Sequence, residues 1–274
     1  MAQPGTAGSI PRIGYGTWNR NGEAAYNGVR WALEAGYRHV DTAEAYKNEA
    51  EVGRAIADGG LRRGEIFLTT KVAPENLGPG QVMPHVKASL DKLRTGQVDL
   101  LLVHWPAVKD VYDIEDYMAQ FAEVFDAGLA KHIGVSNFTK RHLDSALRIL
   151  GSRPIATNQV EIHVLMQNRP IVDYTAAKGI PLTAYSPLAR GAVSKLPLLR
   201  KISATHNATP EQIALAFLLA EGHIVIPSSS SRERIVSNLA ANDIALSAEE
   251  VRQIRALDSG KRLVNGAWCP VWDV

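Results

Sequence analysis

The sequence predicts an α/β fold of the (β/α)8 barrel type, a single domain over residues 1–274 with a C-terminal tail folded over one rim. Eight short apolar segments alternate with amphipathic ones, which fits a barrel of this length. Most of these segments are too apolar to have a face in water, as expected of parallel strands covered by helices. No Pro/Gly-rich linker divides the chain. The alternative, a doubly wound open sheet, is less favoured because the number of strands is eight.

The candidate strands are the short apolar runs. In order along the chain they are residues 10–17, 38–41, 66–71, 98–104, 132–136, 155–159, 181–185 and 223–227. The pair Gly14 and Gly16 in the first run lacks the third glycine and the acidic residue of a dinucleotide fingerprint. It therefore does not indicate a Rossmann turn.

The amphipathic segments between the runs predict helices. Residues 23–35 place Val29 and Leu33 on one side and end before Gly36, a typical C-terminal stop. Residues 82–93 repeat this pattern. Thr209 is an N-cap candidate for a helix whose run 213–220 is apolar nearly all round, which predicts a buried helix. Residues 248–257 form the last amphipathic segment.

Composition narrows the function classes. The 30 Lys and Arg nearly balance the 28 Asp and Glu, which gives no reason to expect nucleic acid or an anionic membrane as a partner. The single cysteine, Cys269, excludes an internal disulfide and a cysteine-rich zinc site. No run is long enough to cross a bilayer, and residues 1–12 do not look like a signal peptide. We therefore expect a cytoplasmic protein with no bound metal. We also expect a monomer, although nothing in the sequence itself bears on the oligomeric state.

Four polar residues converge on one rim of the predicted barrel. Asp41, Lys71 and His104 end three consecutive strands, and Tyr46 lies in the loop after the first of these. The carboxyl ends of barrel strands form the usual active-site face. Each residue alone is more often structural, as a loop residue, a helix cap or a packing histidine. Four together, in consecutive units, favour a catalytic site.

These four groups suit the reduction of a carbonyl, which needs a hydride on carbon and a proton on oxygen. Tyr46 is the candidate proton donor, although an ordinary phenol has a pKa near ~10 and is a weak acid at neutral pH. We expect the ammonium of Lys71 to lower the pKa of Tyr46, and Asp41 to keep Lys71 charged and oriented. His104 would hydrogen-bond the substrate oxygen.

The residues around these positions resemble the aldo-keto reductase family. Residues 36–46 match its opening signature, Leu68-Thr69-Thr70-Lys71 and Leu102-Val103-His104-Trp105-Pro106 match its other two motifs, and the similarity covers nearly the whole chain. Within the family the chain is most similar to short bacterial 2,5-diketo-D-gluconate reductases of the methylglyoxal reductase type. The segments 226–229 and 262–265 support that closer match.

The resemblance implies NADPH as cofactor, with NADH bound more weakly. Ser136, Asn137 and Gln159 would hold the nicotinamide carboxamide, and Tyr185 would stack on its ring. From the residues alone, Ser136 and Asn137 also read as an N-cap for the next helix. The full set of expected cofactor contacts is Gly16, Thr17, Asp41, Ser136, Asn137, Gln159, Tyr185, Ser186, Leu188, Ser228, Ser229, Arg234 and Asn238.

The predicted adenosine end departs from the family pattern. Many relatives have a lysine where this chain has Ser228, which removes one cation from the 2′-phosphate. Arg234 matches the second phosphate contact, with Arg232 close by, and guanidinium groups bind phosphate bidentately. Asn238 matches an adenine contact, but its usual acidic neighbour is replaced by Ser237. NADPH is still the favoured cofactor.

The substrate pocket is predicted to lie between aromatic walls. Trp18 and Trp105 would wall it beside Tyr46 and His104, and Ala73 stands where relatives often carry tryptophan, which predicts a wider pocket on that side. The tail contains Trp268 and other apolar residues that need a surface to cover. Either they cap the outside of the barrel, or, as the resemblance implies, Trp268 closes over the pocket opposite Trp18.

We therefore expect NADPH-dependent reduction of small aldehydes, α-keto aldehydes or keto sugars. A metal-dependent barrel hydrolase is less favoured because there is no paired His-x-His at a strand end. A non-catalytic NADPH sensor that docks on a partner is opposed by the complete set of four polar residues.

Overall fold

The computed structural model describes residues 6–7 and 10–273. Within these residues, eight consecutive parallel strands, β3 to β10, form one sheet. The sheet closes between its first and last strands. Ile13 bridges Val225 in parallel, and the N–H of Gly14 donates to the carbonyl of Val225 at 2.8 Å. The predicted (β/α)8 barrel is confirmed.

The strands agree with the predicted runs except at the two ends of the sheet. They are β3 (Tyr15–Gly16), β4 (His39–Asp41), β5 (Phe67–Val72), β6 (Val98–Val103), β7 (Ala130–Ser136), β8 (Ile155–Glu161), β9 (Leu182–Tyr185) and β10 (Ile224–Val225). The first run, 10–17, does not form one strand, and the last is two residues long. The prediction of one strand over 10–17 was wrong, whereas the predicted strand at 223–227 is present but shorter.

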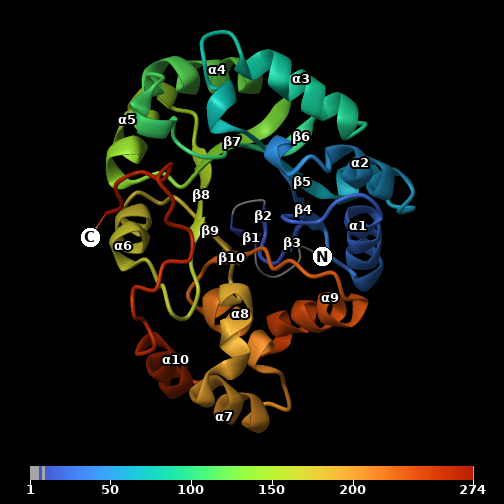
Figure 1. Ribbon diagram of the computed structural model, residues 1–274, viewed down its shortest axis with the longest axis vertical. Helices are drawn as coiled ribbons and strands as arrows, with labels where there is room; N and C mark the ends of the chain where they lie inside the picture. The colour runs from blue at the N-terminus through green and yellow to red at the C-terminus, as the bar shows by residue number, and fades with distance from the viewer. Residues whose placement is uncertain (1–5, 8–9, 274) are drawn as a thin grey trace.

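The first run is divided because its beginning pairs elsewhere. Strands β1 (Thr6–Ala7) and β2 (Ile10–Pro11) form an antiparallel hairpin, which Figure 1 shows inside the ring of barrel strands. Ile10 is buried against Leu100, Leu102 and Ile224, with Phe67 and Ala156 beside them. Phe67, Ala156 and Ile224 stand at the beginnings of their strands. The hairpin therefore closes the amino end of the barrel and leaves the carboxyl end open.

Helices surround the barrel (Figure 1). They are α1 (Glu23–Ala35), α2 (Glu49–Ala57), α3 (Val82–Lys92), α4 (Ile114–Asp126), α5 (Lys140–Leu150), α6 (Arg169–Ala177), α7 (Pro197–Thr205), α8 (Pro210–Ala220), α9 (Arg232–Leu239) and α10 (Ala248–Arg255). Helix α1 has the predicted bounds and ends at Gly36, whose φ of 111° suits glycine. Thr209 caps α8 through a capping box, and residues 213–219 of this helix are all buried, as predicted.

The chain after α10 forms the tail, residues 258–273. Figure 1 shows it running from α10 past α6 and ending near α5. No helix in the described part of the chain is both long and apolar enough to cross a bilayer.

Candidate active site

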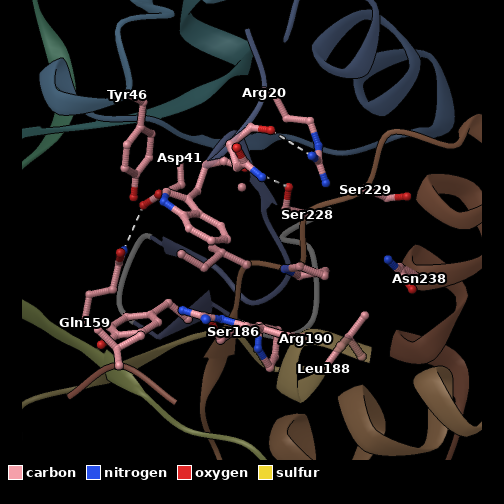
Figure 2. Close-up of a pocket in the computed structure, with 18 of the residues that line it drawn as sticks. Arg20, Asp41, Tyr46, Gln159, Ser186, Leu188, Arg190, Ser228, Ser229 and Asn238 are labelled. Carbon is pink, nitrogen blue, oxygen red and sulfur yellow. Dashed lines mark hydrogen bonds between the residues drawn. The ribbon is translucent and has the colours of Figure 1, made fainter. Parts of the chain in front are cut away.

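A cavity of about 970 Å³ opens at the carboxyl ends of the barrel strands (Figure 2). It extends from Tyr46 and His104, beside β4 and β6, to Arg234 and Asn238 on α9. The size is at the upper end of ordinary ligand pockets. Most of the predicted site residues line it. The exceptions are Lys71 and Thr17, which lie behind the cavity surface.

Strand register brings Asp41 and Lys71 together. Asp41 is paired with Thr69 across β4 and β5, and Lys71, two residues further along, points to the same face. The ammonium of Lys71 donates to the carboxylate of Asp41 at 2.5 Å, and both side chains are almost fully buried, at 0% and 2% exposed. A buried ion pair of this kind costs about 3–5 kcal/mol to break by removing one partner.

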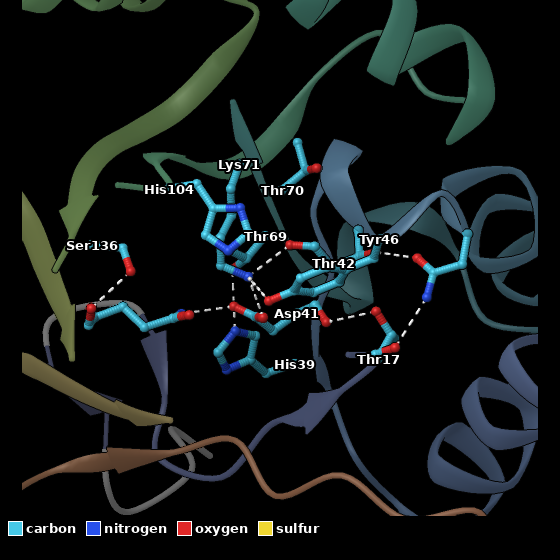
Figure 3. A network of polar contacts seen from close by, with 12 residues as sticks. Thr17, His39, Asp41, Thr42, Tyr46, Thr69, Thr70, Lys71, His104 and Ser136 are labelled. Carbon is cyan, nitrogen blue, oxygen red and sulfur yellow. Dashed lines mark hydrogen bonds and ion pairs between the residues drawn. The ribbon is translucent and has the colours of Figure 1, made fainter. Parts of the chain in front are cut away.

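The ammonium of Lys71 also donates to the carbonyl of Thr42 at 2.8 Å and to the hydroxyl of Tyr46 at 3.5 Å (Figure 3). An ammonium has three donors, so these contacts and Asp41 use all of them. Because the oxygen of Tyr46 accepts from Lys71, the proton of Tyr46 remains available to a group in the cavity.

The expectation that the pKa of Tyr46 lies below that of an ordinary phenol is wrong for this structure. Burial of the phenol, with a smaller effect from the negative charge of Asp41, raises the pKa of Tyr46 well above 10.0. Burial also lowers the pKa of Lys71, while Asp41 acts in the opposite direction. The positive charge is already paired with Asp41 and does not offset the loss of water around the phenol. Tyr46 therefore stays protonated at neutral pH.

His104 follows β6, and its ring lies edge-on to Tyr46 with 5.4 Å between the ring centroids. Burial, and secondarily the charge of Lys71, lowers the pKa of His104 well below 6.5. The ring is therefore neutral at pH 7 and carries one N–H. Its Nδ1 is buried without a hydrogen-bond partner. A buried polar atom without a partner calls for an explanation, and at a residue that lines the cavity a functional role is one.

Polar side chains at the end of β7 and in β8 connect Asp41 and His104 to the rest of the cavity. Gln159 donates to the free oxygen of Asp41 at 2.8 Å, and Ser136 donates to the backbone carbonyl of Gln159 at 2.8 Å. The side chain of Asn137 donates to the carbonyl of His104 at 3.0 Å and accepts from the hydroxyl of Tyr185 at 2.9 Å. The N-cap reading of Ser136 and Asn137 is wrong, because Thr139 caps α5.

The other end of the cavity is polar and basic. Arg234 lines it, and its Nε donates to the hydroxyl of Ser229 at 3.3 Å. Ser228 and Asn238 line the same end, with Asn238 in the second half of α9. Arg232 instead pairs with Glu34 at 3.2 Å and is not among the lining residues. Of the two arginines considered from the sequence, the structure places only Arg234 at the cavity.

Two further arginines at the cavity were not predicted from the sequence. Arg20 and Arg190 line it (Figure 2), and the guanidinium of Arg190 lies 5.6 Å from the ring centroid of Trp18. Arg190 has a left-handed backbone with φ of 51° in the loop after β9. Their signal in the sequence was only a basic residue in each of two loops, after Trp18 and after Leu188.

The cavity surface fits an elongated anionic dinucleotide. Three arginines lie along it, and among the described residues that line it only Asp41, which is paired, and Glu211 are acidic. Gly16, which also lines the cavity, packs closely on the segment after β10, since a Cβ there would meet the carbonyl of Ile226 at 2.8 Å. Among the described residues, no group of three or more His, Cys, Asp or Glu side chains is arranged to hold a metal ion.

The two predicted aromatic walls and the tail also meet at the cavity. Trp18, Trp105 and Trp268 line it, and Trp272 lies edge-on to Trp105 with ring centroids 6.1 Å apart. The tail therefore covers the cavity rather than the outside of the barrel. Ala73 does not line the cavity. Its N–H donates at 2.5 Å to Glu44, which also accepts from Asn76 at 2.9 Å and holds this loop away from the opening.

Fold and site together define a barrel enzyme with its polar groups at the carboxyl ends of the strands. The chain belongs to the aldo/keto reductase family, whose model matches residues 12–259. Members of this family are oxidoreductases that generally use NAD(P)H.

The most similar proteins include bacterial reductases. The chain is 45% identical to methylglyoxal reductase DkgB of Salmonella typhi, over 97% of this chain and all of that protein, and 44% identical to DkgB of Escherichia coli O157:H7 over the same shares. A solved structure of a candidate 2,5-diketo-D-gluconic acid reductase B is 39% identical with a TM-score of 0.92, covering 97% of this chain and 94% of that one.

A more distant solved structure has the same fold. The aldose reductase of Schistosoma japonicum is 34% identical with a TM-score of 0.88, over 93% of this chain and 91% of that one. The family and these relatives indicate that this chain is an oxidoreductase that reduces carbonyl groups.

Proposed function

We propose that this chain reduces small aldehydes, α-keto aldehydes or keto sugars to alcohols, with NADPH as the preferred cofactor. The single observation that carries the proposal is the buried group Asp41, Lys71 and Tyr46, with the free proton of Tyr46 available to the cavity beside His104. The similarity to proteins named methylglyoxal reductase supports the substrate class. A cytoplasmic, monomeric enzyme is part of the same proposal.

In this proposal Tyr46 gives its proton to the substrate oxygen. Its raised pKa keeps the proton in place until negative charge develops on that oxygen. The ammonium of Lys71, at 3.5 Å, then stabilises the phenolate as it forms. Asp41 fixes Lys71 in position, and the neutral ring of His104 donates its one N–H to the substrate oxygen. The four residues thus divide donation, charge stabilisation and orientation among them.

The cofactor residues are proposed on the same basis. A bound nicotinamide would supply the hydride for the carbonyl carbon. Asn137, Ser136 and Gln159 would hold its amide, because their side chains offer both donors and acceptors at the catalytic end of the cavity. The ring of Tyr185 would pack on the nicotinamide. The remaining predicted contacts at the cavity surface are Gly16, Asp41, Ser186, Leu188, Ser228, Ser229, Arg234 and Asn238.

Thr17 acts indirectly in this proposal. Its side chain is fully buried, and its hydroxyl donates to the backbone carbonyl of Asp41 at 3.1 Å. It therefore fixes the end of β4 rather than facing the cavity. The substrate would lie between Trp18, Trp105 and Trp268, with its carbonyl toward Tyr46 and His104.

The test is a substrate panel with the purified chain. NADPH should be oxidised with methylglyoxal and with small aldehydes, and NADH should be oxidised more slowly. Absence of NADPH and NADH oxidation with every carbonyl of the panel would contradict the proposal. Binding of NADPH without any turnover would favour the sensor alternative instead.

A further inference from the structure

The carboxylate of Glu161 lies between the barrel and the tail. Glu161 is the last residue of β8, its side chain is 0% exposed, and the proposed reaction gives it no part. It pairs in register with Tyr185, which lines the cavity. A buried carboxylate is costly unless it is hydrogen-bonded, so its partners show what it holds in place.

Two of the donors to this carboxylate are consecutive backbone amides of the tail. The N–H of Leu263 donates to one oxygen at 2.6 Å, and the N–H of Val264 donates to the other at 2.8 Å. Charged hydrogen bonds of this kind are stronger than neutral ones. The carboxylate thus binds the tail backbone itself and does not depend on a tail side chain.

The third donor is His163, whose Nε2 lies 3.1 Å from Glu161. Because the N–H of Leu165 donates to Nδ1 of His163 at 3.2 Å, Nδ1 is an acceptor and the ring proton is on Nε2. Burial of Glu161 raises the pKa of its carboxyl, but these three donors outweigh burial and lower it. The carboxylate is therefore charged at neutral pH, and two of its three donors come from the tail.

The tail segment bound in this way reaches the cavity. Val264 lines the cavity, and so does Trp268, four residues further along. The backbone just before Leu263 is also fixed to the loop after β8, because the N–H of Lys261 donates to the carbonyl of Leu165 at 2.9 Å. Figure 1 shows the tail passing this side of the barrel beside β8 and β9. The position of the cavity wall thus depends on the bonds to Glu161.

We propose that Glu161 is a positioning residue for substrate selection. By holding the amides of Leu263 and Val264, it fixes Val264 and Trp268 over the substrate end of the cavity. This rests on the proposed function, because it assigns the cover made by the tail to the choice of carbonyl substrate. Glu161 takes no part in proton or hydride transfer.

The test compares Glu161→Gln with a matched variant, Asp99→Asn. Glutamine keeps the shape but removes the charge, and its NH2 group faces one tail amide without accepting from it. Amide hydrogen exchange at Leu263 and Val264 should rise by about tenfold, the value of one hydrogen bond. The ratio of kcat/KM for a bulky over a small aldehyde should change about threefold to tenfold through KM. The kcat for the small aldehyde should stay nearly constant.

Asp99 is a suitable control because it is another buried carboxylate far from the tail. It is the second residue of β6, at the amino end of the barrel, and accepts from the N–H of Leu68 at 3.0 Å and from Lys131 at 2.7 Å. Asp99→Asn should lower Tm but leave both exchange at Leu263 and Val264 and the substrate ratio unchanged. A general loss of stability would move both variants alike.

The proposal is overturned if Glu161→Gln changes neither tail exchange nor the ratio beyond the control. If Glu161→Gln does not fold, Leu263→Pro removes one donor from the tail side instead, and the same ratio decides. Faster exchange with an unchanged ratio would overturn the selection role alone. No turnover of any carbonyl by the intact chain would overturn that role together with the proposed function.

Discussion

The carboxyl ends of the barrel strands, here called the rim, and the tail line two parts of one cavity. They are held in place in very different ways. At the rim, Lys71 and Asp41 are 0% and 2% exposed, and each donor of the ammonium has a partner. In the tail, Trp268 is 52% exposed and Val271 is 95% exposed. A closed polar network on barrel strands keeps its geometry, whereas a segment bound by a few contacts can vary. The comparison suggests that the rim performs the chemistry and the tail selects the substrate.

The largest effect is expected when the rim loses its proton donor. In Tyr46→Phe the ring still packs, but no proton reaches the substrate oxygen, so kcat should fall by about 10⁴-fold, the upper end for general acid catalysis. Affinity for NADPH, measured by fluorescence titration, should change little. A kcat close to that of the intact chain on an aldehyde would show that Tyr46 is not the acid.

Removing the cation should cost less than removing the acid. Lys71→Met takes away the charge that stabilises the forming phenolate, and we expect a loss of about 10²-fold or more in kcat. The intact chain should reduce aldehydes at a constant rate from neutral into alkaline pH, because burial raises the pKa of Tyr46. A kcat in the variant close to that of the intact chain would contradict the role of Lys71.

The same variant leaves the charge of Asp41 buried without its cation. Its free energy of unfolding should fall by about 3–5 kcal/mol, as measured by urea denaturation. The double variant Lys71→Met with Asp41→Asn should recover part of this stability without recovering activity. Recovery of activity as well would mean that the cation acts only by holding the fold.

At the far end of the cavity, Arg234→Ala tests the cofactor preference. One charge-assisted contact to a 2′-phosphate contributes about 1.5–3 kcal/mol, so KM for NADPH should rise roughly tenfold to hundredfold. KM for NADH should change little. Arg232→Ala is the matched control, since Arg232 pairs with Glu34 and not with the cavity. Equal effects of Arg234→Ala on both cofactors would mean that Arg234 does not bind this phosphate.

The smallest effect is expected in the tail. A Cβ at Gly266 would lie 2.1–2.5 Å from ring atoms of Trp268, so Gly266→Ala should displace that ring. We expect a change of about twofold to threefold in the substrate ratio, the scale of one altered apolar contact, and no change with the smallest aldehyde. A loss of activity on all substrates alike would show that Trp268 serves the chemistry.

Much of the barrel could be predicted because its signals are local. The apolar runs around Val40, Leu101 and Ile133 predicted strands β4, β6 and β7. Gly36 and Thr209 predicted the end of α1 and the start of α8. The N-terminal hairpin could not be predicted in this way. Whether Ile10 continues into β3 or turns into an antiparallel pair depends on the space left at the end of the closed barrel.

The site was predictable where residues end consecutive strands, as with Asp41, Lys71 and His104. The direction of the pKa shift of Tyr46 was not, because it depends on burial, which residue identity does not give. Glu161 was missed for a different reason. Its partner Leu263 is 102 residues away, and the bond uses the backbone of the tail, which has no signature in the sequence.

The most direct test of this division between rim and tail is the rate of the chemical step after the tail is shortened. Residues 266–274 are deleted, and single-turnover oxidation of NADPH is followed with the smallest aldehyde and with a bulky one. The rate with the smallest aldehyde should stay within a factor of about three of that of the intact chain, while KM for the bulky aldehyde changes. A rate with the smallest aldehyde as low as that of Tyr46→Phe, in a variant that remains folded, would contradict the account.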